Sequence, residues 1–188
     1  MQGATGLRSL RERPFDLLRE IDRRARAAAQ GQTEATASGS EWVGVAFRLG
    51  GEAFLLAREE TREVLAYPAA ITRVPGARGW IRGLSNVRGQ LLPVVDLRAF
   101  LGAGATTVTR TSRVLIANHR EIPAGLVVDE VMGFRRFYEG EFSADLPPTL
   151  LRCERYLAGA FKRGAEVWPV FSVKTLLESP QFMQAAAS

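Results

Sequence analysis

The 188-residue sequence has few of the residues that usually carry catalysis or bind metals. Cys153 is the only cysteine, so the chain forms no internal disulfide and no zinc site built from cysteines. His119 is the only histidine, and no serine or cysteine in a recognisable catalytic setting accompanies it. Motifs for phosphate loops, dinucleotide binding, nucleophile elbows and zinc proteases are missing too. We therefore expect no enzyme, no cofactor and no metal.

Long hydrophobic runs are missing as well. The longest apolar runs, such as 91–95 and 126–128, are far shorter than the roughly 18 residues that span a bilayer. Arginines and acids interrupt residues 7–26, which leaves no apolar core for a signal peptide. The hydrophobic fraction of 46% and the charged fraction of 24% are ordinary for a soluble globular domain. The sequence thus predicts a cytoplasmic protein without membrane insertion.

Lysine is scarce, because 23 of the 25 basic residues are arginines, and the net charge is +5. Residues 73–113 contain seven arginines and a single acid, Asp96. Such a stretch is suited to nucleic acid or to an acidic protein surface. It lacks the lysine clusters and interleaved aromatics that are typical of a nucleic-acid groove. We therefore expect no nucleic-acid partner, and a basic nucleic-acid-binding β-barrel is kept only as an alternative from a different class.

The chain divides into three zones. Residues 1–40 are an N-terminal extension, in which apolar residues at helical spacing predict a helix ending near Gly31 before a polar linker. The folded domain is expected at 41–178, and residues 179–188 are expected to be a frayed tail. The apolar positions of the predicted helix are Phe15, Leu18, Ile21, Ala25 and Ala28.

The folded domain has the pattern of many short strands. Residues 43–49 alternate between apolar and small or charged residues, and Gly50-Gly51 favours a tight hairpin turn into a strand at 53–57. We expect short helices at 58–67 and 172–177. Many short strands separated by Gly and Pro predict an all-β fold, with more strands than one small barrel needs. The other predicted strands are 79–84, 89–95, 113–118, 124–128, 156–161 and 167–171.

Residues 74–101, VPGARGWIRGLSNVRGQLLPVVDLRAFL, are the most informative segment. They predict a strand, a turn at 86–89 and a buried strand at 91–95. Pro93 has no N–H to donate, so this strand is expected at a sheet edge or with a bulge. Asp96 is placed to cap the following turn. Turn chemistry alone explains the glycines and the aspartate without any ligand.

This segment resembles the signature of the CheW family of chemotaxis adaptors. Arg82-Gly83, Asn86, Arg88-Gly89, Pro93-Val94 and Asp96-Leu97-Arg98 match that signature in register. Further segments agree with the family in order and spacing, at 42–49, 59–65, 113–133 and 156–177. Ser172 is a departure, since the family usually has Asp there. The N-terminal helix, the Asn-Val-Arg-Gly turn and Trp80 resemble the adaptors of type IV pilus (twitching motility) systems more than the flagellar ones.

The resemblance implies two intertwined five-stranded SH3-like barrels around a shared core, and no catalysis. Members of the family connect the cytoplasmic tip of methyl-accepting chemoreceptors to the regulatory domain of a CheA-type histidine kinase. It therefore implies a chemosensory scaffold in receptor arrays at the inner membrane, with control of type IV pili as the expected output. An adaptor of a flagellar chemotaxis system is the alternative within the same family.

The resemblance also implies a set of partner-binding residues. The guanidinium of Arg88 suits this role, because its planar fork of donors fits a carboxylate or the carbonyls at the end of a receptor helix. The alternative is that Arg88 only braces its own domain. The expected receptor- and kinase-facing residues are Thr61, Glu63, Gly83, Asn86, Arg88 and Gly89.

Overall fold

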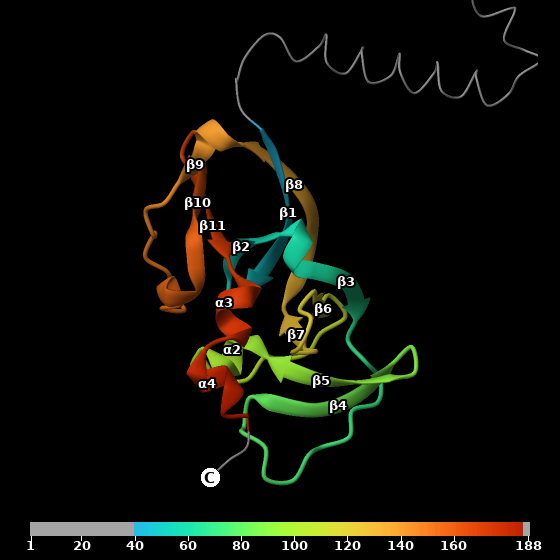
Figure 1. The fold of residues 1–188 in the computed structure, drawn as a ribbon. Coiled ribbons are helices and arrows are strands. Elements are labelled where there is room, and N and C mark those ends of the chain that lie inside the picture. The colour runs from blue at the N-terminus through green and yellow to red at the C-terminus, as the bar shows by residue number, and fades with distance from the viewer. Residues whose placement is uncertain (1–39, 186–188) are drawn as a thin grey trace, which may run out of the picture. The chain divides into compact units, whose positions relative to one another are not determined.

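The computed structural model describes residues 40–185, and the predicted N-terminal helix lies outside this range. The described part contains two β-sheets (Figure 1). The order in the first sheet is β8 (Glu130–Tyr138), β1 (Glu41–Leu49), β2 (Glu52–Ala57), β11 (Glu166–Phe171), β10 (Leu157–Arg163) and β9 (Phe142–Ser143). The order in the second sheet is β3 (Thr61–Ala66), β6 (Arg113–Ala117), β7 (Gly125–Val128), β5 (Gln90–Asp96) and β4 (Ile81–Val87).

The two sheets are intertwined in sequence. The chain builds β1 and β2 of the first sheet, then all of the second sheet, and returns to complete the first with β8 to β11. The central strands are joined by parallel pairs, β2 with β11 and β5 with β7, that connect distant parts of the chain. The prediction of an all-β, two-barrel fold is confirmed. The first sheet has six strands instead of five because the two-residue β9 adds to its edge.

A charged pair closes each sheet into a barrel. In the first sheet, Arg163 donates two hydrogen bonds to Glu141 (2.6 and 2.8 Å) and one to the carbonyl oxygen of Arg136 on β8 (2.8 Å). In the second, Arg88 donates to Glu63 across the two edge strands, from the β4–β5 hairpin to β3. Each contact ties one edge region of a sheet to the other, so the sheets curl instead of staying flat.

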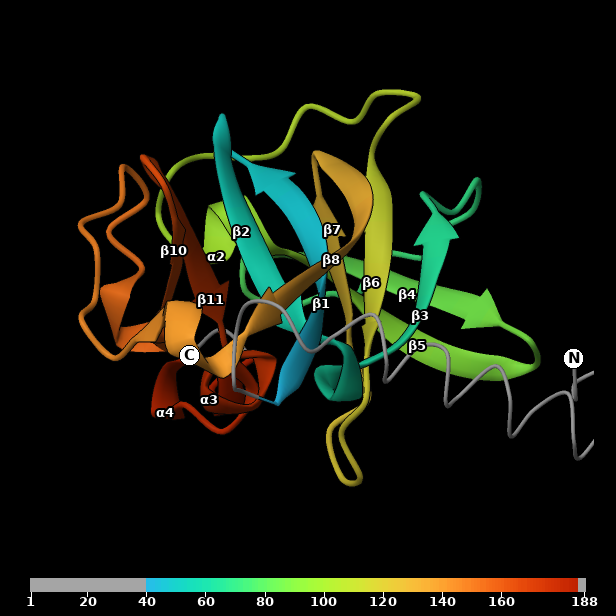
Figure 2. The same ribbon diagram turned by 90° about the horizontal axis from the view of Figure 1, so that it is seen from above.

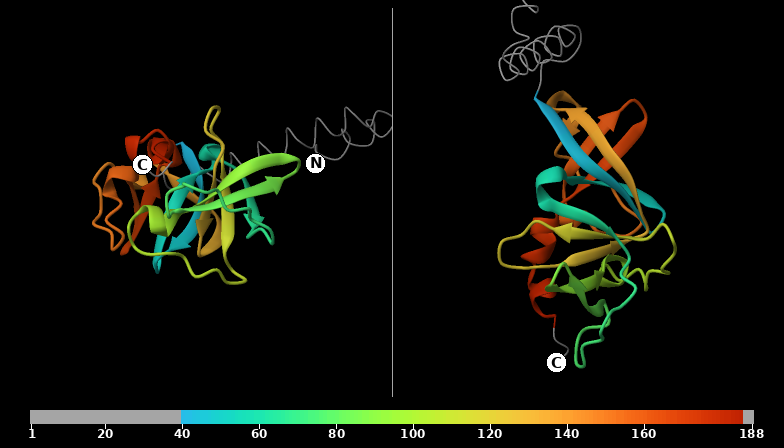
Figure 3. Two further views of the ribbon diagram at one scale, coloured as in Figure 1. Left: turned by 90° about the horizontal axis from the view of Figure 1, so that it is seen from below. Right: turned by 90° about the vertical axis from the view of Figure 1, so that its right-hand side faces the viewer.

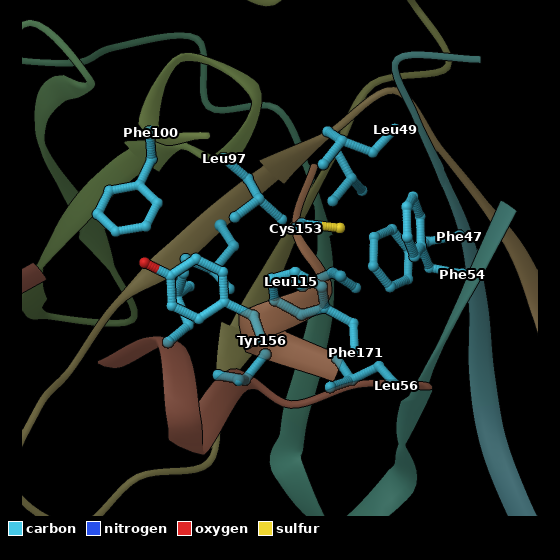
Figure 4. Packing of buried hydrophobic residues seen from close by; sticks show 14 of the residues in the cluster. Phe47, Leu49, Phe54, Leu56, Leu97, Phe100, Leu115, Cys153, Tyr156 and Phe171 are labelled. Carbon is cyan, nitrogen blue, oxygen red and sulfur yellow. The ribbon is translucent and has the colours of Figure 1, made fainter. Parts of the chain in front are cut away.

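Both barrels share one hydrophobic core. Phe47, Phe54 and Phe171 pack with ring centroids 5.6 to 6.3 Å apart, and Leu115 from the second sheet joins the same cluster (Figure 4). The Cys153 thiol is fully buried there, and this burial raises its pKa. Cys153 is therefore a packing residue and not a nucleophile.

Side chains cap the N-terminal ends of two short helices, and of these caps the one by Asp96 was predicted. The Asp96 side chain accepts from the Ala99 N–H (3.1 Å) at the start of α2 (Leu97–Phe100). The Ser172 hydroxyl accepts from the Thr175 N–H (3.2 Å) at the start of α3 (Val173–Leu177). Serine and aspartate are both good N-cap residues, so Ser172 fills the structural role expected of the family's aspartate.

The predicted helix at 58–67 is wrong. Only the 3-10 turn η1 (Arg58–Glu60) is helical, and residues 61–66 form strand β3 paired with β6. β3 is an edge strand whose side chains are mostly half-buried, so it lacks a clear alternation of buried and exposed residues. Pairing with β6 satisfies its backbone and overrides the helical propensity of its glutamate, leucine and alanine residues.

The C-terminal segment is more ordered than predicted. Instead of fraying, it forms α4 (Pro180–Met183), with Ser179 as the N-cap and Pro180 at the first helical position. The Phe182 ring is buried and stacks on Trp80 at 5.4 Å between centroids. The Ser179-Pro180 pair is the sequence signal that favours a helix here.

The position of Pro93 also differs from the prediction. β5 lies inside its sheet, and the bulge in its pairing with β4 lies between Ile81 and Gly83. Leu84, opposite Pro93, exchanges both of its backbone hydrogen bonds with Thr72 instead. The pairing of β5 with β7 begins one residue after Pro93. The missing N–H therefore leaves no neighbouring carbonyl without a partner.

Strands β8 and β9 were not predicted. β8 pairs with β1 along almost its whole length, across an irregularity near Ala46.

Among residues 40–185, no helix has both the length and the apolar character that crossing a bilayer requires.

Candidate functional site

Arg88 stands at the tip of a two-residue hairpin turn. Val87 pairs with Gln90, and the two residues between them both have positive φ, +53° for Arg88 and +83° for Gly89. This is the backbone of a type I′ turn, in which glycine is favoured and arginine is uncommon. The Asn86 side chain holds the turn by accepting from the Gly89 N–H (2.8 Å). Asn86 and Gly89 thus fix the backbone from which the Arg88 side chain extends.

The Arg88 guanidinium has one internal partner. Its Nη2 lies 2.5 Å from Oε1 of Glu63, and the Arg88 side chain is 78% exposed. Within residues 40–185 its other N–H groups make no hydrogen bond, so most of its donors face solvent. An exposed ion pair contributes only about 0–1 kcal/mol to folding. Both readings of Arg88 therefore have a structural basis, but the bracing contribution is small.

A cleft lies beside this pair, between η1–β3 and β8. It has a volume of about 520 Å³, and its walls include Thr61, Glu63, Val64 and Phe134. Phe134 on β8 is 62% exposed, which is unusual for a phenylalanine. The Thr61 hydroxyl oxygen is buried and has no hydrogen-bond partner among the described residues. The cleft therefore offers an exposed apolar contact, Phe134, beside the charged side chain of Glu63.

The cleft and the hairpin tip form one surface. Glu63 lines the cleft and also bonds Arg88, so it connects the two. Figures 1 and 2 show β3 and the tip of the β4–β5 hairpin on the same side of the second sheet. Of the residues predicted from sequence, the structure brings together Thr61, Glu63, Asn86, Arg88 and Gly89.

Gly83 is placed differently from the other predicted residues. It is buried within β4 and has a φ of +140°. A Cβ atom here would lie 2.2 Å from the carbonyl oxygen of Thr72. Gly83 therefore permits the close approach of the 70–72 segment and does not present a surface to a partner.

Sequence reasoning missed Phe134 because β8 was not predicted. The signal is the parity of the strand: Phe137 is buried, so a residue three positions away points to the opposite face. An exposed aromatic residue on that face is then expected at Phe134.

The polar pair Arg82 and Asp96 of the signature is internal. Asp96 is fully buried and accepts hydrogen bonds from Arg82 Nε (3.0 Å) and Nη2 (2.6 Å), and from the N–H (2.9 Å) and hydroxyl (2.7 Å) of Thr106. Arg82 also donates to the carbonyl oxygen of Thr106 (2.6 Å). The signature therefore has a structural part, around Asp96, and an exposed part, around Arg88.

Most arginines of the arginine-rich stretch have a partner within the chain. Arg82 and Arg88 pair with carboxylates, and three further arginines donate to backbone carbonyl oxygens. Those three are Arg78, Arg98 and Arg113. Only Arg82 and Arg88 are thus paired with a negative charge, and the stretch keeps most of its positive charge.

The surroundings of His119 and Cys153 differ. His119 hydrogen-bonds with Glu178 and with the backbone N–H groups of Glu121 and Ile122, whereas Cys153 lies in the hydrophobic core. Residues 40–185 contain no cluster of three or more side chains that suits a metal ion.

Comparisons with known proteins agree with this architecture. Residues 43–181 match the family model described as CheW-like domain. Protein PilI of Pseudomonas aeruginosa is 39% identical over 173 residues, covering 92% of this chain and 96% of PilI. The chemotaxis protein CheW of Bacillus subtilis is 29% identical over 53% of this chain and 64% of its own length. The crystal structure of the scaffolding protein TtCheW from Thermoanaerobacter tengcongensis superposes with a TM-score of 0.66 at 26% identity, covering 76% of this chain and 96% of TtCheW.

Proposed function

Because the chain belongs to the CheW-like family, we propose that it is a non-enzymatic scaffold coupling methyl-accepting chemoreceptors to a CheA-type histidine kinase in a type IV pilus chemosensory system. The observation that carries the proposal is the similarity to PilI, which covers nearly the whole of both chains. The mixed apolar and charged cleft beside Arg88 supports a protein partner.

The extent of the PilI match favours the pilus output over the flagellar one. It leaves only 15 residues of this chain unmatched, so it includes most of the N-terminal extension at 1–40. The match to the Bacillus subtilis CheW covers about half of this chain, and the longer match to the Helicobacter pylori CheW, over 84% of it, has only 24% identity against 39% for PilI. The extension is therefore shared with PilI, in line with the pilus-type resemblance of the N-terminal helix.

On the receptor side, the cleft and the hairpin tip would bind the helical tip of a chemoreceptor. An apolar receptor side chain would pack on the exposed ring of Phe134. The free donors of Arg88 would bind a carboxylate or the carbonyls at a helix end. Glu63 would keep the guanidinium oriented between binding events.

The proposal also gives a location and a second partner. The chain would work on the cytoplasmic side of the inner membrane, in receptor arrays, and bind the regulatory domain of the kinase. No enzymatic step, cofactor or nucleic acid enters this role.

The receptor contact is tested by co-sedimentation of the full-length chain with the cytoplasmic fragment of a pilus-system receptor. We expect Phe134→Ser and Arg88→Ala each to weaken binding several-fold, since exposed anchors of this kind usually contribute more than 1 kcal/mol. Arg110→Ala is the matched control, because Arg110 is an exposed arginine that neither lines the cleft nor belongs to the hairpin turn. Equal binding by all four proteins would contradict the proposed contact.

Binding experiments also distinguish the two alternative functions, a flagellar adaptor and a nucleic-acid-binding barrel. Binding to the flagellar kinase alone would favour the flagellar adaptor. A fluorescence anisotropy signal with DNA or RNA that falls steeply with salt would favour a nucleic-acid-binding barrel.

A further inference from the structure

The loop between β6 and β7 is folded around the ring of His119. The ring nitrogen Nδ1 accepts hydrogen bonds from the backbone N–H groups of Glu121 (3.3 Å) and Ile122 (3.1 Å). A ring nitrogen that accepts an N–H carries no proton of its own. These two bonds therefore require the neutral ring with its proton on Nε2.

The other ring nitrogen faces a carboxylate. Nε2 lies 3.4 Å from Oε1 of Glu178, the residue that caps the C-terminal end of α3. The tautomer set by the loop is thus the one that donates to Glu178. His119 therefore connects the β6–β7 loop to the end of α3, and Figure 3 (left) shows this loop beside that helix.

The connection spans two walls of an apolar groove of about 550 Å³. Glu121, Ile122 and Pro123 contribute the wall from the loop. Phe182 and Met183 contribute the wall from α4, which begins two residues after Glu178. Ile122 also packs against the main hydrophobic core. The hydrogen bonds of the His119 ring therefore help to hold the loop wall of this groove in place.

Several charged groups surround the ring. The Glu178 carboxylate faces Nε2, and Arg62 of β3 lines a small cavity with His119. The neighbouring Arg120 and Glu121 carry opposite charges. The strongest geometric constraint is the pair of N–H groups aimed at Nδ1, because a proton there would face two donors. The His119 side chain is 17% exposed, so solvent protons reach it.

We propose that His119 is a pH-sensitive clasp that opens the loop wall of this groove when Nδ1 gains a proton from solvent. The new N–H would displace the Glu121 and Ile122 N–H groups, and both loop hydrogen bonds would break. Histidine ordinarily changes charge between pH 5 and 8, so the clasp is closed at the upper end of this range and open at the lower end. This proposal about His119 does not depend on the proposed scaffold function, so an experiment can disprove one of the two without affecting the other.

The test is a pH titration of the full-length chain by NMR, from pH 8 to pH 5. We expect the amide signals of Glu121 and Ile122 to shift with the same midpoint as the His119 ring protons. Their hydrogen exchange, corrected for the intrinsic pH dependence, should accelerate about tenfold as the bonds are lost. A ring that titrates while both amides stay unchanged would overturn the proposal.

Two variants separate a clasp from a merely structural contact. In His119→Asn the side-chain oxygen can accept from the N–H groups two and three residues on, but it does not titrate. The amide transition should then be absent between pH 8 and pH 5, and its persistence would overturn the proposal. Glu178→Gln keeps a side-chain acceptor for the Nε2 proton, so the Glu121 and Ile122 amides should keep their bonds to Nδ1 at pH 8. Loss of both bonds at pH 8 would overturn the assigned tautomer and the proposal with it.

Discussion

At the scale of single residues, Arg88 and Asp96 show how one sequence signature serves two purposes. Asp96 is fully buried and accepts hydrogen bonds from three other residues, whereas the Arg88 side chain is mostly exposed on a turn that favours glycine. The cost of arginine at a positive φ indicates that its side chain, and not the turn, is the reason for its presence.

Replacing Arg88 by glycine separates these two roles. Arg88→Gly relieves the positive φ and loses an exposed ion pair, so the free energy of unfolding should change by less than about 1 kcal/mol. Receptor binding should still weaken, because the donors are gone. Chemical denaturation and co-sedimentation measure the two effects. A loss of stability well above this range would instead support the bracing role.

Asp96→Asn should be strongly destabilising. The substitution leaves Arg82 without its buried counter-charge, and breaking a buried pair typically costs about 3–5 kcal/mol. For a domain of this size that corresponds to a fall in Tm of roughly 10 °C. Asp145→Asn is the matched control, because Asp145 is 85% exposed and its ion pair with Lys162 contributes little. A Tm of Asp96→Asn equal to that of the control would contradict the structural role.

At the scale of elements, the predictable parts are those with local signals. The strands flanking Gly50-Gly51 and the Asn86–Gly89 turn follow from alternation and turn chemistry, and the caps of α2 and α3 follow from Asp96 and Ser172. β3 was missed because its identity comes from pairing with β6, a partner far along the chain. Only one wall of the cleft, with Thr61 and Glu63, was predicted from sequence. The other wall includes Phe134 on β8, and the sequence of β8 has no clear strand pattern.

Helix α4 is expected to be held mainly by one side chain. Phe182→Ala removes a buried ring that contacts Trp80 and Phe100, which should cost about 3 kcal/mol. Met183→Ala, in the same helix but 62% exposed, should change stability by less than about 0.5 kcal/mol. Thermal melts of the two variants provide the comparison, and equal melting temperatures would mean that α4 is not anchored as described.

The pair that closes the first barrel predicts a pH dependence. The hydrogen bonds from Arg163, together with one from the Tyr138 N–H, lower the pKa of Glu141 from 4.5 to about 2. A carboxyl group with a lowered folded pKa stabilises the fold above its unfolded pKa and loses this effect as pH falls towards the folded value. The wild type should therefore be more stable than Glu141→Gln at pH 6, with a difference that shrinks below about pH 4.5. A difference that is constant down to pH 3 would contradict the assignment.

At the scale of the whole molecule, the shared core explains why the two barrels behave as one unit. Residues of both sheets, α2 and α3 belong to the largest buried cluster, while each sheet also has a smaller buried cluster of its own. The order of the strands is the part that sequence patterns could not give, because parallel pairs such as β2 with β11 join segments more than 100 residues apart. The resemblance to the CheW family supplied the two intertwined barrels but not the order of their strands, and the structure agrees with that fold.

The central claim is that this chain is a scaffold between receptors and a kinase of the pilus system. Calorimetry with the isolated regulatory domain of the pilus-system kinase from the same organism tests it most directly. We predict saturable binding with a Kd in the micromolar range, about −8 kcal/mol. No binding by a folded sample, or binding only to the flagellar kinase, would contradict the account.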